Sequence, residues 1–305
     1  MTVFGVHAGL QHTQLDTLRG LWRRVEDLGF GWISVWDHFY SATLGDDPVC
    51  HEAVATHAAL ACETSRVRVG SLVYSVGYRH PAVLANAICT IDHLSHGRAD
   101  LGLGAGWSKI EYDAYGIAFP GIKTRMDQLE EAIQCVRGLL TDEQTTFEGE
   151  WFQMHGARCE PKPVQQHLPI WVGGGGEQRT LRIVARYADG WNIPFPSPEV
   201  FAAKRAVLLQ RCDEVGRDPS EIRCAVNVGL AWTEESLLSQ FGGLAPMVRP
   251  GVLSGSDAEV IDRIGRYVEA GADQVNLALR AEPAGYDGRF DLDALDRFAT
   301  ALGLH

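Results

Sequence analysis

The sequence predicts a closed (β/α)₈ barrel, for three reasons. Apolar runs of strand length alternate with amphipathic helical segments along nearly all of the 305 residues, and about eight such pairs complete a barrel. The chain is 46% hydrophobic, so it can bury a large core. No linker, low-complexity tract or internal repeat interrupts the alternation, so we expect one domain over residues 1–305. An open, doubly wound parallel sheet is the alternative that the same alternation allows.

The predicted strands are short apolar runs. They cover residues 3–8, 32–36, 67–76, 99–103, 169–172, 190–193, 222–228 and 274–279. The third run is almost continuously apolar, which is typical of a parallel strand covered on both faces. Barrel enzymes place their chemistry at the carboxyl ends of such strands, so the residues that follow each run are the first candidates for a site.

The predicted helices are segments in which apolar residues recur every three or four positions. They cover residues 15–28, 52–63, 81–96, 125–140, 177–187, 198–215, 256–270 and 291–302. Pro81 suits the first turn of its helix. Gly29 and Gly97 suit the ends of theirs.

Other segments depart from this rhythm. Residues 141–168, with aromatic residues around Gly149 and two prolines behind them, predict an inserted hairpin or arm at the barrel rim. Residues 41–51, 107–123 and 229–255 are expected to form the walls of a pocket. The last of these is apolar, which favours a mobile lid over a fairly apolar, small-molecule substrate; its large apolar residues are Phe241, Leu244, Met247 and Val248.

Composition excludes several classes of function. The net charge of −12 and the lack of a basic stripe argue against nucleic acid or an anionic membrane as a partner. No apolar run reaches the roughly 20 residues of a membrane span, and the N-terminus has no leader pattern, so we expect a cytoplasmic protein. The seven cysteines form no Cys-x-x-Cys pair and the histidines no His-Glu-x-x-His pattern, so we expect no metal site.

A glycine run provides the first candidate binding site. Gly173, Gly174, Gly175 and Gly176 separate a predicted strand from a helix that we expect to begin near Glu177. Unpaired backbone N–H groups and the positive end of the helix would face outward together, which favours a phosphate or another anion. Such a site needs no lysine. A flexible tether is the alternative, although it would lose backbone entropy without a compensating contact.

Asp37 and His38 follow the second predicted strand. A histidine there can give a proton to a redox ring or take one from it, because its ordinary pKa of about 6.5 lies near working pH. Asp37 can orient the imidazole or bind the edge of a cofactor ring. In the alternative interpretation the role of His38 is structural, and its ring forms hydrogen bonds with backbone carbonyls of the loop.

The stretch from Leu101 to Trp107 combines an apolar strand with alternating glycines. Gly104 and Gly106 allow the backbone to approach a ligand closely. The Trp107 indole can stack on a ring or a substrate, or else pack at the rim. The pair before Pro81, Arg79 and His80, is expected mainly to start a helix.

Several of these motifs occur together and in order. They are Asp37-His38-Phe39, the Gly-Ala-Gly-Trp at 104–107, the glycine run ending in Glu177 and the Tyr-Ala-Asp-Gly-Trp-Asn at 187–192. This set resembles the bacterial luciferase-like superfamily, most closely its coenzyme F420 (deazaflavin) branch. The resemblance implies a TIM barrel, a homodimer and hydride transfer between F420 and an organic substrate. Two alternatives remain: an FMN-dependent monooxygenase, and a luciferase-like protein that has lost catalysis.

The resemblance also implies roles for individual residues on the cofactor side. In F420-using relatives an Asp-His pair, matched here by Asp37 and His38, places the histidine over the reactive ring. A cis peptide, by position the bond between Leu72 and Val73, backs that ring.

On the substrate side the sequence departs from its relatives. Val54 stands where many close relatives have tryptophan, which would enlarge the pocket. Trp107 replaces the glutamate of sugar-phosphate-oxidising relatives, which argues against that substrate. Tyr74, at the end of the third strand, is expected in the same pocket.

Overall fold

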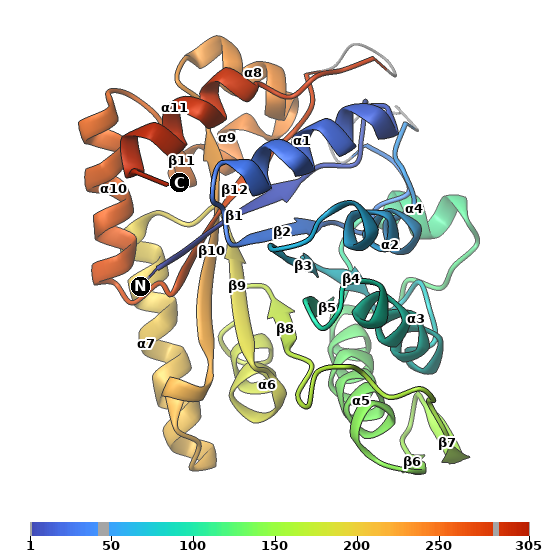
Figure 1. Cartoon of the computed structure of the whole chain (residues 1–305). Helices are drawn as coiled ribbons and strands as arrows, with labels where there is room; N and C mark the ends of the chain where they lie inside the picture. The colour runs from blue at the N-terminus through green and yellow to red at the C-terminus, as the bar shows by residue number, and fades with distance from the viewer. Residues whose placement is uncertain (1, 42–48, 283–286, 305) are drawn as a thin grey trace.

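The computed structural model, which describes residues 2–41, 49–282 and 287–304, contains a closed parallel barrel (Figure 1). Its strands pair in the order β1-β2-β3-β5-β8-β9-β10-β12, and β12 pairs with β1 to close the ring. The barrel strands are β1 (Val3–Ala8), β2 (Trp32–Val35), β3 (Arg68–Ser71), β5 (Ala99–Gly104), β8 (Ile170–Gly173), β9 (Gly190–Pro194), β10 (Arg223–Leu230) and β12 (Gln274–Leu279). The predicted barrel is therefore confirmed, and the open sheet is wrong because the edges of this sheet pair with each other.

Helices surround the barrel (Figure 1). The longer ones are α1 (Leu15–Asp27), α2 (Ala53–Glu63), α3 (Pro81–Leu94), α5 (Ile122–Thr141), α6 (Thr180–Tyr187), α7 (Pro198–Val215), α10 (Asp257–Glu269) and α11 (Leu292–Leu302). Between β5 and α5 lies a short helix, α4 (Lys109–Ala114), which periodicity did not predict. Six residues are too few to show a repeat of 3.6.

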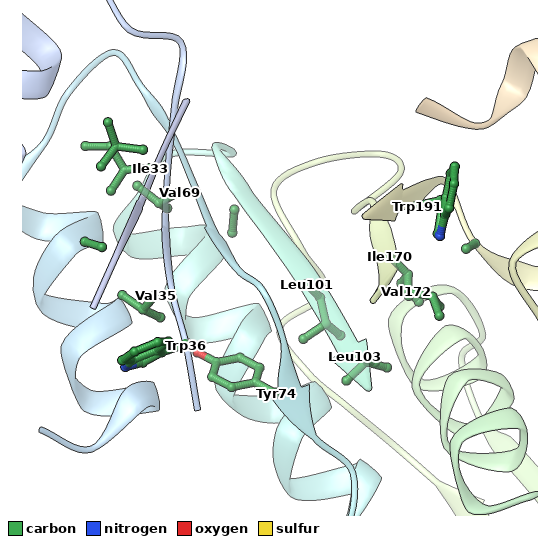
Figure 2. Packing of buried hydrophobic residues seen from close by; sticks show 14 of the residues in the cluster. Ile33, Val35, Trp36, Val69, Tyr74, Leu101, Leu103, Ile170, Val172 and Trp191 are labelled. Atoms are coloured by element: carbon green, nitrogen blue, oxygen red, sulfur yellow. The ribbon is translucent and has the colours of Figure 1, made fainter. Parts of the chain in front are cut away.

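Inward and outward positions alternate along the barrel strands, as the pleat requires. Outward residues pack under the helices in one large apolar cluster, part of which Figure 2 shows. The labelled members from β2, β3, β5 and β8 are Ile33, Val35, Val69, Leu101, Leu103, Ile170 and Val172. Inward residues form a smaller plug around Trp32 and Trp171, whose rings lie 6.1 Å apart. This plug fills the barrel below the strand ends.

The third predicted strand is interrupted. It is divided into β3 and the two-residue β4 (Tyr74–Ser75), which pairs with the end of β5. The intervening bond between Leu72 and Val73 is a cis peptide, as the resemblance implied. The break turns both side chains toward the barrel mouth.

The predicted arm is an antiparallel hairpin of β6 (Thr145–Glu148) and β7 (Gln153–Ala157) beside α5 (Figure 1). It connects the end of α5 to the start of β8. It therefore lies at the amino-terminal face of the barrel, opposite the carboxyl ends of the strands.

The predicted lid contains α8 (Glu234–Phe241), α9 (Ala245–Val248), short 3₁₀ turns and the two-residue strand β11 (Val252–Leu253). Its apolar residues form a separate cluster that includes Phe241, Leu244 and Val248. Among the described residues, no helix is both long and apolar enough to cross a membrane.

Candidate active site

A cavity of about 660 Å³ opens at the carboxyl ends of the barrel strands. That volume is typical of small-molecule and cofactor sites. The predicted site residues that line it are Asp37, His38, Leu72, Val73, Gly104, Gly106, Trp107, Gly173 and Gly174. Folding thus brings the Asp-His pair and the start of the glycine run into one site, although more than 130 positions separate them in the sequence.

Two residues expected in the substrate pocket lie elsewhere. Val54 is on α2 and packs against the outer core, because the helices of a barrel cover the outside of its strands. Tyr74 is fully buried, and its hydroxyl lies 2.8 Å from Nδ1 of His57. Neither belongs to the described residues that line the cavity, so the expected enlargement through Val54 is wrong. Of the predicted wall at 41–51, residues 42–48 lie outside the described part of the chain.

His38 is oriented by a residue that sequence reasoning did not assign. Its Nδ1 lies 2.8 Å from Oε2 of Glu111, a side chain on α4 that is only 1% exposed. The other carboxylate oxygen accepts the backbone N–H groups of Phe39 and Tyr40. An ionised carboxylate only accepts hydrogen bonds, so Nδ1 of His38 carries a proton. In the neutral tautomer with that proton, Nε2 has a free lone pair.

Glu111 is suited to this role because it stays ionised. Burial alone would raise its pKa, but the hydrogen bond and charge interaction with His38, together with further donors, lower the pKa of Glu111 to about 2. The hydroxyl of Tyr78 is one more neighbour, 3.0 Å from Oε2. Periodicity gave no reason to single out Glu111, because it lies in the weakly patterned segment between Trp107 and Arg125; its place shortly after the Gly-Ala-Gly-Trp motif was the available signal.

Two indoles flank the imidazole edge to face. The ring centroids of Trp36 and Trp107 lie 5.4 and 5.3 Å from that of His38. Within the described residues no protein group is hydrogen-bonded to Nε2 of His38. The imidazole therefore lines the cavity with one nitrogen available to a ligand.

Asp37 does not orient His38. Its carboxylate accepts two bonds from the guanidinium of Arg79, at 2.7 and 3.0 Å, and one from the amide of Ser75 at 2.9 Å. Arg79 also pairs with Glu52, which caps α2. Asp37 thus links β2, β4 and two helix starts beside the cavity, and it remains a predicted cofactor contact.

Val73 and two glycines lie against each other in the cavity lining. A Cβ added to Gly104 would lie 2.5 Å from Cγ2 of Val73, and one added to Gly173 would lie 2.9 Å from Cγ1 of the same residue. Side chains at either position would displace Val73 from the barrel mouth. Gly106 has a φ of 75°, which favours glycine.

The rest of the glycine run lies in an adjoining open groove of about 530 Å³. Gly175 and Gly176 line it with Thr180 and Lys204, and Ile122, Met126 and Thr180 line the cavity as well. Helix α6 begins at Thr180 and not near Glu177, because residues 177–179 form a turn. The predicted free amides therefore come from the loop itself.

In the described chain, the amides of Gly175 and Gly176 donate to no protein acceptor, whereas that of Gly174 donates to Asn192. The groove offers two open N–H groups and a hydroxyl next to a mainly apolar cavity. This donor set fits an anionic tail attached to a planar ring. A flexible tether is not needed to explain the glycines.

Sequence reasoning also missed polar residues on the inner wall. His7, Asn192, Asn227 and Arg280 all line the cavity. Strand alternation could have indicated Arg280. Every second residue of β12 faces inward (Gln274, Asn276 and Ala278), and Arg280 is the next in this series, just past the end of the strand.

The fold and the site together define a parallel-barrel protein with a cavity at the carboxyl ends of its strands and a fixed imidazole in the cavity wall. The family model described as luciferase-like monooxygenase matches residues 1–241. The chain belongs to this luciferase-like family.

Curated relatives include F420-dependent enzymes. The chain is 34% identical over 221 residues to the F420-dependent glucose-6-phosphate dehydrogenase of Kineococcus radiotolerans, covering 70% of this chain and 63% of that enzyme. It is 38% identical over 133 residues to an uncharacterized protein of Mycobacterium tuberculosis, covering 44% of this chain and 46% of that protein. The alignments thus span roughly half to two thirds of the curated relatives.

Solved structures share the fold. An F420-dependent secondary alcohol dehydrogenase superimposes with a TM-score of 0.80 at 20% identity, covering 91% of this chain and 93% of that one. The long-chain alkane monooxygenase LadA gives 0.79 at 16% identity, covering 99% and 91%. At these identities the likenesses concern the fold.

Proposed function

We propose that this protein is an F420-dependent oxidoreductase acting on a small organic substrate. The observation that carries the proposal is the imidazole of His38, fixed by Glu111 with Nε2 open to the cavity. The F420-dependent relatives, at 31–35% identity, support the choice of cofactor. When bound, F420 supplies a ring carbon that exchanges a hydride with substrate.

The residues of this chain have separable roles in that proposal. The floor of Leu72, Val73 and Gly104 would hold the ring. The amides of Gly175 and Gly176 would hold the phosphate. His38 would then take the proton of a substrate hydroxyl at Nε2, or return it, while Glu111 stabilises the charged imidazolium through Nδ1. Trp36 and Trp107 keep water from the edges of the imidazole.

The apolar lining supports a fairly apolar substrate. Leu129 from α5 and Leu244, Met247 and Val248 from the lid contribute to the cavity wall. When substrate displaces water from this apolar cavity, the electrostatic contacts inside the cavity become stronger.

We also propose a homodimer. Light scattering coupled to gel filtration tests this directly.

The competing function is an FMN-dependent monooxygenase. The similarity in fold to the alkane monooxygenase is the reason to test it. Anaerobic fluorescence titration of the protein with F420 and with FMN, followed by a separate measurement of oxygen uptake with reduced FMN in aerated buffer, tests the choice. We expect saturable binding of F420 at micromolar concentration and no oxygen uptake with reduced FMN. Oxygen uptake with reduced FMN and no F420 binding would establish the alternative. If neither cofactor binds, the proposed activity is wrong and a non-catalytic role follows.

A further inference from the structure

The cavity contains a buried cation that has no counter-charge in the part of the chain that the structure describes. Arg280 lies directly after β12 and lines the cavity, and only 7% of its surface is exposed. In the described residues its guanidinium forms no ion pair or hydrogen bond, and Nη1 is fully buried without a partner. Buried charges are ordinarily paired, so this exception points to a partner that the protein itself does not supply.

Arg280 remains charged near neutral pH. Burial is the sole cause that shifts its pKa, lowering it to about 9, which leaves the protonated form dominant at pH 7. The one carboxylate among the described lining residues, Asp37, is already held by Arg79. His7, which also lines the cavity, is neutral because burial and then the charge of Arg280 lower its pKa to about 3.

Aromatic rings hold the guanidinium in place. It lies 4.7 Å from the ring centroid of Trp36 and 4.8 Å from that of Phe241. Phe241 belongs to the lid and is fully buried against Phe195. Contact with aromatic faces partly offsets the cost of burying the positive charge. The rings provide no hydrogen-bond acceptor in the plane of the guanidinium, so its N–H groups stay available to a ligand.

The cation is close to the acid-base group. The indole of Trp36 contacts both the guanidinium of Arg280 and, edge to face, the imidazole of His38. A ligand bound to Arg280 would therefore extend its neighbouring atoms toward His38. The apolar walls from Leu244 and Val248 lie along the same cavity.

We infer that the substrate carries a carboxylate that binds Arg280, with its reacting carbon a few bonds away near His38. A guanidinium matches the planar, two-oxygen geometry of a carboxylate. Arg280 is the one Lys or Arg among the described lining residues, so the charge fits a monoanion better than a phosphate dianion. This assignment of substrate class rests on the proposed oxidoreductase function.

Binding to the cofactor-free protein tests the inference without any turnover. The probes are 4-oxopentanoate and its neutral counterpart 4-oxopentanamide, compared by isothermal titration calorimetry. We expect the carboxylate to bind saturably and the amide at least about 10-fold more weakly, since hydrogen bonds to charged groups are the stronger ones. The variant R280Q should weaken carboxylate binding about 10- to 100-fold and leave amide binding within threefold. R280K keeps the positive charge but cannot bind both carboxylate oxygens with a planar pair of N–H groups, so it should give an intermediate loss of carboxylate affinity.

Arg223 provides the matched control, because its guanidinium also stacks on an indole, that of Trp171 at 5.3 Å, but it lies outside the residues that line the cavity. R223Q should bind the carboxylate like the wild type. The melting temperature of R280Q should be unchanged or raised, since an unpaired buried charge is removed. Equal binding of acid and amide, or an R280Q variant that binds like the wild type, would overturn the inference.

The outcome is independent of the cofactor test. The protein could bind the carboxylate through Arg280 and yet bind neither F420 nor FMN. That result would support the carboxylate site and contradict the proposed oxidoreductase function. The reverse pattern, with F420 bound and no difference between acid and amide, would retain the oxidoreductase and reject the carboxylate substrate.

Discussion

At the scale of single residues, the pairing of His38 with Glu111 separates two interpretations of the histidine. A histidine that only satisfied loop carbonyls would have both ring nitrogens engaged. Here Nδ1 is engaged by a buried carboxylate and Nε2 faces the cavity. The same carboxylate accepts the amides of Phe39 and Tyr40, so one side chain fixes both the imidazole and the loop that carries it.

Replacing Glu111 by glutamine should therefore change the protonation pattern of His38. We expect the Nδ1–H form, dominant in the wild type, to become mixed in E111Q, because an amide can donate as well as accept. The free energy of unfolding should fall by about 1–3 kcal/mol, since several donors share a weaker acceptor. Nitrogen-15 chemical shifts of the imidazole and urea unfolding at pH 7 measure the two effects.

Y78F is the matched control for E111Q. It removes one hydrogen bond to Glu111 but keeps the carboxylate, so the imidazole shifts should stay near their wild-type values. Unchanged imidazole shifts in E111Q would show that Glu111 does not set the tautomer.

At the scale of elements, one side chain accepts the hydrogen bonds of the turn of the arm hairpin. Glu131 of α5 accepts the backbone N–H groups of Glu150, Trp151 and Phe152 at 2.9, 2.9 and 3.0 Å. These three amides form the turn between β6 and β7. The hairpin thus depends on α5 for its turn, and it lies at the face of the barrel away from the cavity.

E131A should loosen this turn and leave the site intact. The three amides lose their acceptor and are hydrated instead, so we expect their hydrogen exchange to quicken by about 10-fold, corresponding to roughly 1–2 kcal/mol of lost local stability. Cofactor affinity should not change. Hydrogen–deuterium exchange of peptides covering residues 149–153 measures the effect.

E130A serves as the control for E131A. Glu130 is the preceding residue of α5 and pairs with Arg186 at 3.3 Å, not with the hairpin. Exchange in the turn should match the wild type in E130A. Equal exchange in both variants and the wild type would mean that Glu131 does not hold the turn.

At the scale of the whole molecule, burial of neutral histidines links folding to pH. Burial lowers the pKa of His57 to about 4, and burial, followed by the charge of Arg280, lowers that of His7 to about 3. In the unfolded chain both titrate near 6.5. Between pH 6.5 and about 4 the unfolded chain binds protons that the folded protein does not, so stability falls as pH falls.

We expect the free energy of unfolding to decrease between pH 6.5 and 4.5 by up to about 1.4 kcal/mol per pH unit for each of the two histidines. The variant H57Q, which cannot titrate, should lose about half of that slope. Urea unfolding at several pH values in this window measures it. H155Q, an exposed position on the arm, is the control and should keep the wild-type slope, and an H57Q slope equal to the wild type would contradict the assignment.

The sequence by itself determined the barrel, most strand and helix positions, the arm and the segments that meet at the mouth. It could do so because hydrophobic periodicity and glycine placement are local properties. The predicted helix bounds were wrong where the apolar repeat is too short or is interrupted. Helix α4 has only six residues, and α6 begins after a turn. The first turn of α5 was not predicted because its apolar residue Ile122 is exposed.

Only the tertiary structure decided which side chains meet. Glu111 reaches His38 across 73 positions of sequence, and Asp37 pairs with Arg79 instead of the imidazole. Tyr74 and Val54 lie in the core and not in the cavity, and Arg280 has no ion-pair partner among the described residues. Such outcomes depend on the register of strands around a closed ring and on which charges find each other once water is excluded, and neither is encoded in the spacing of residues along the chain.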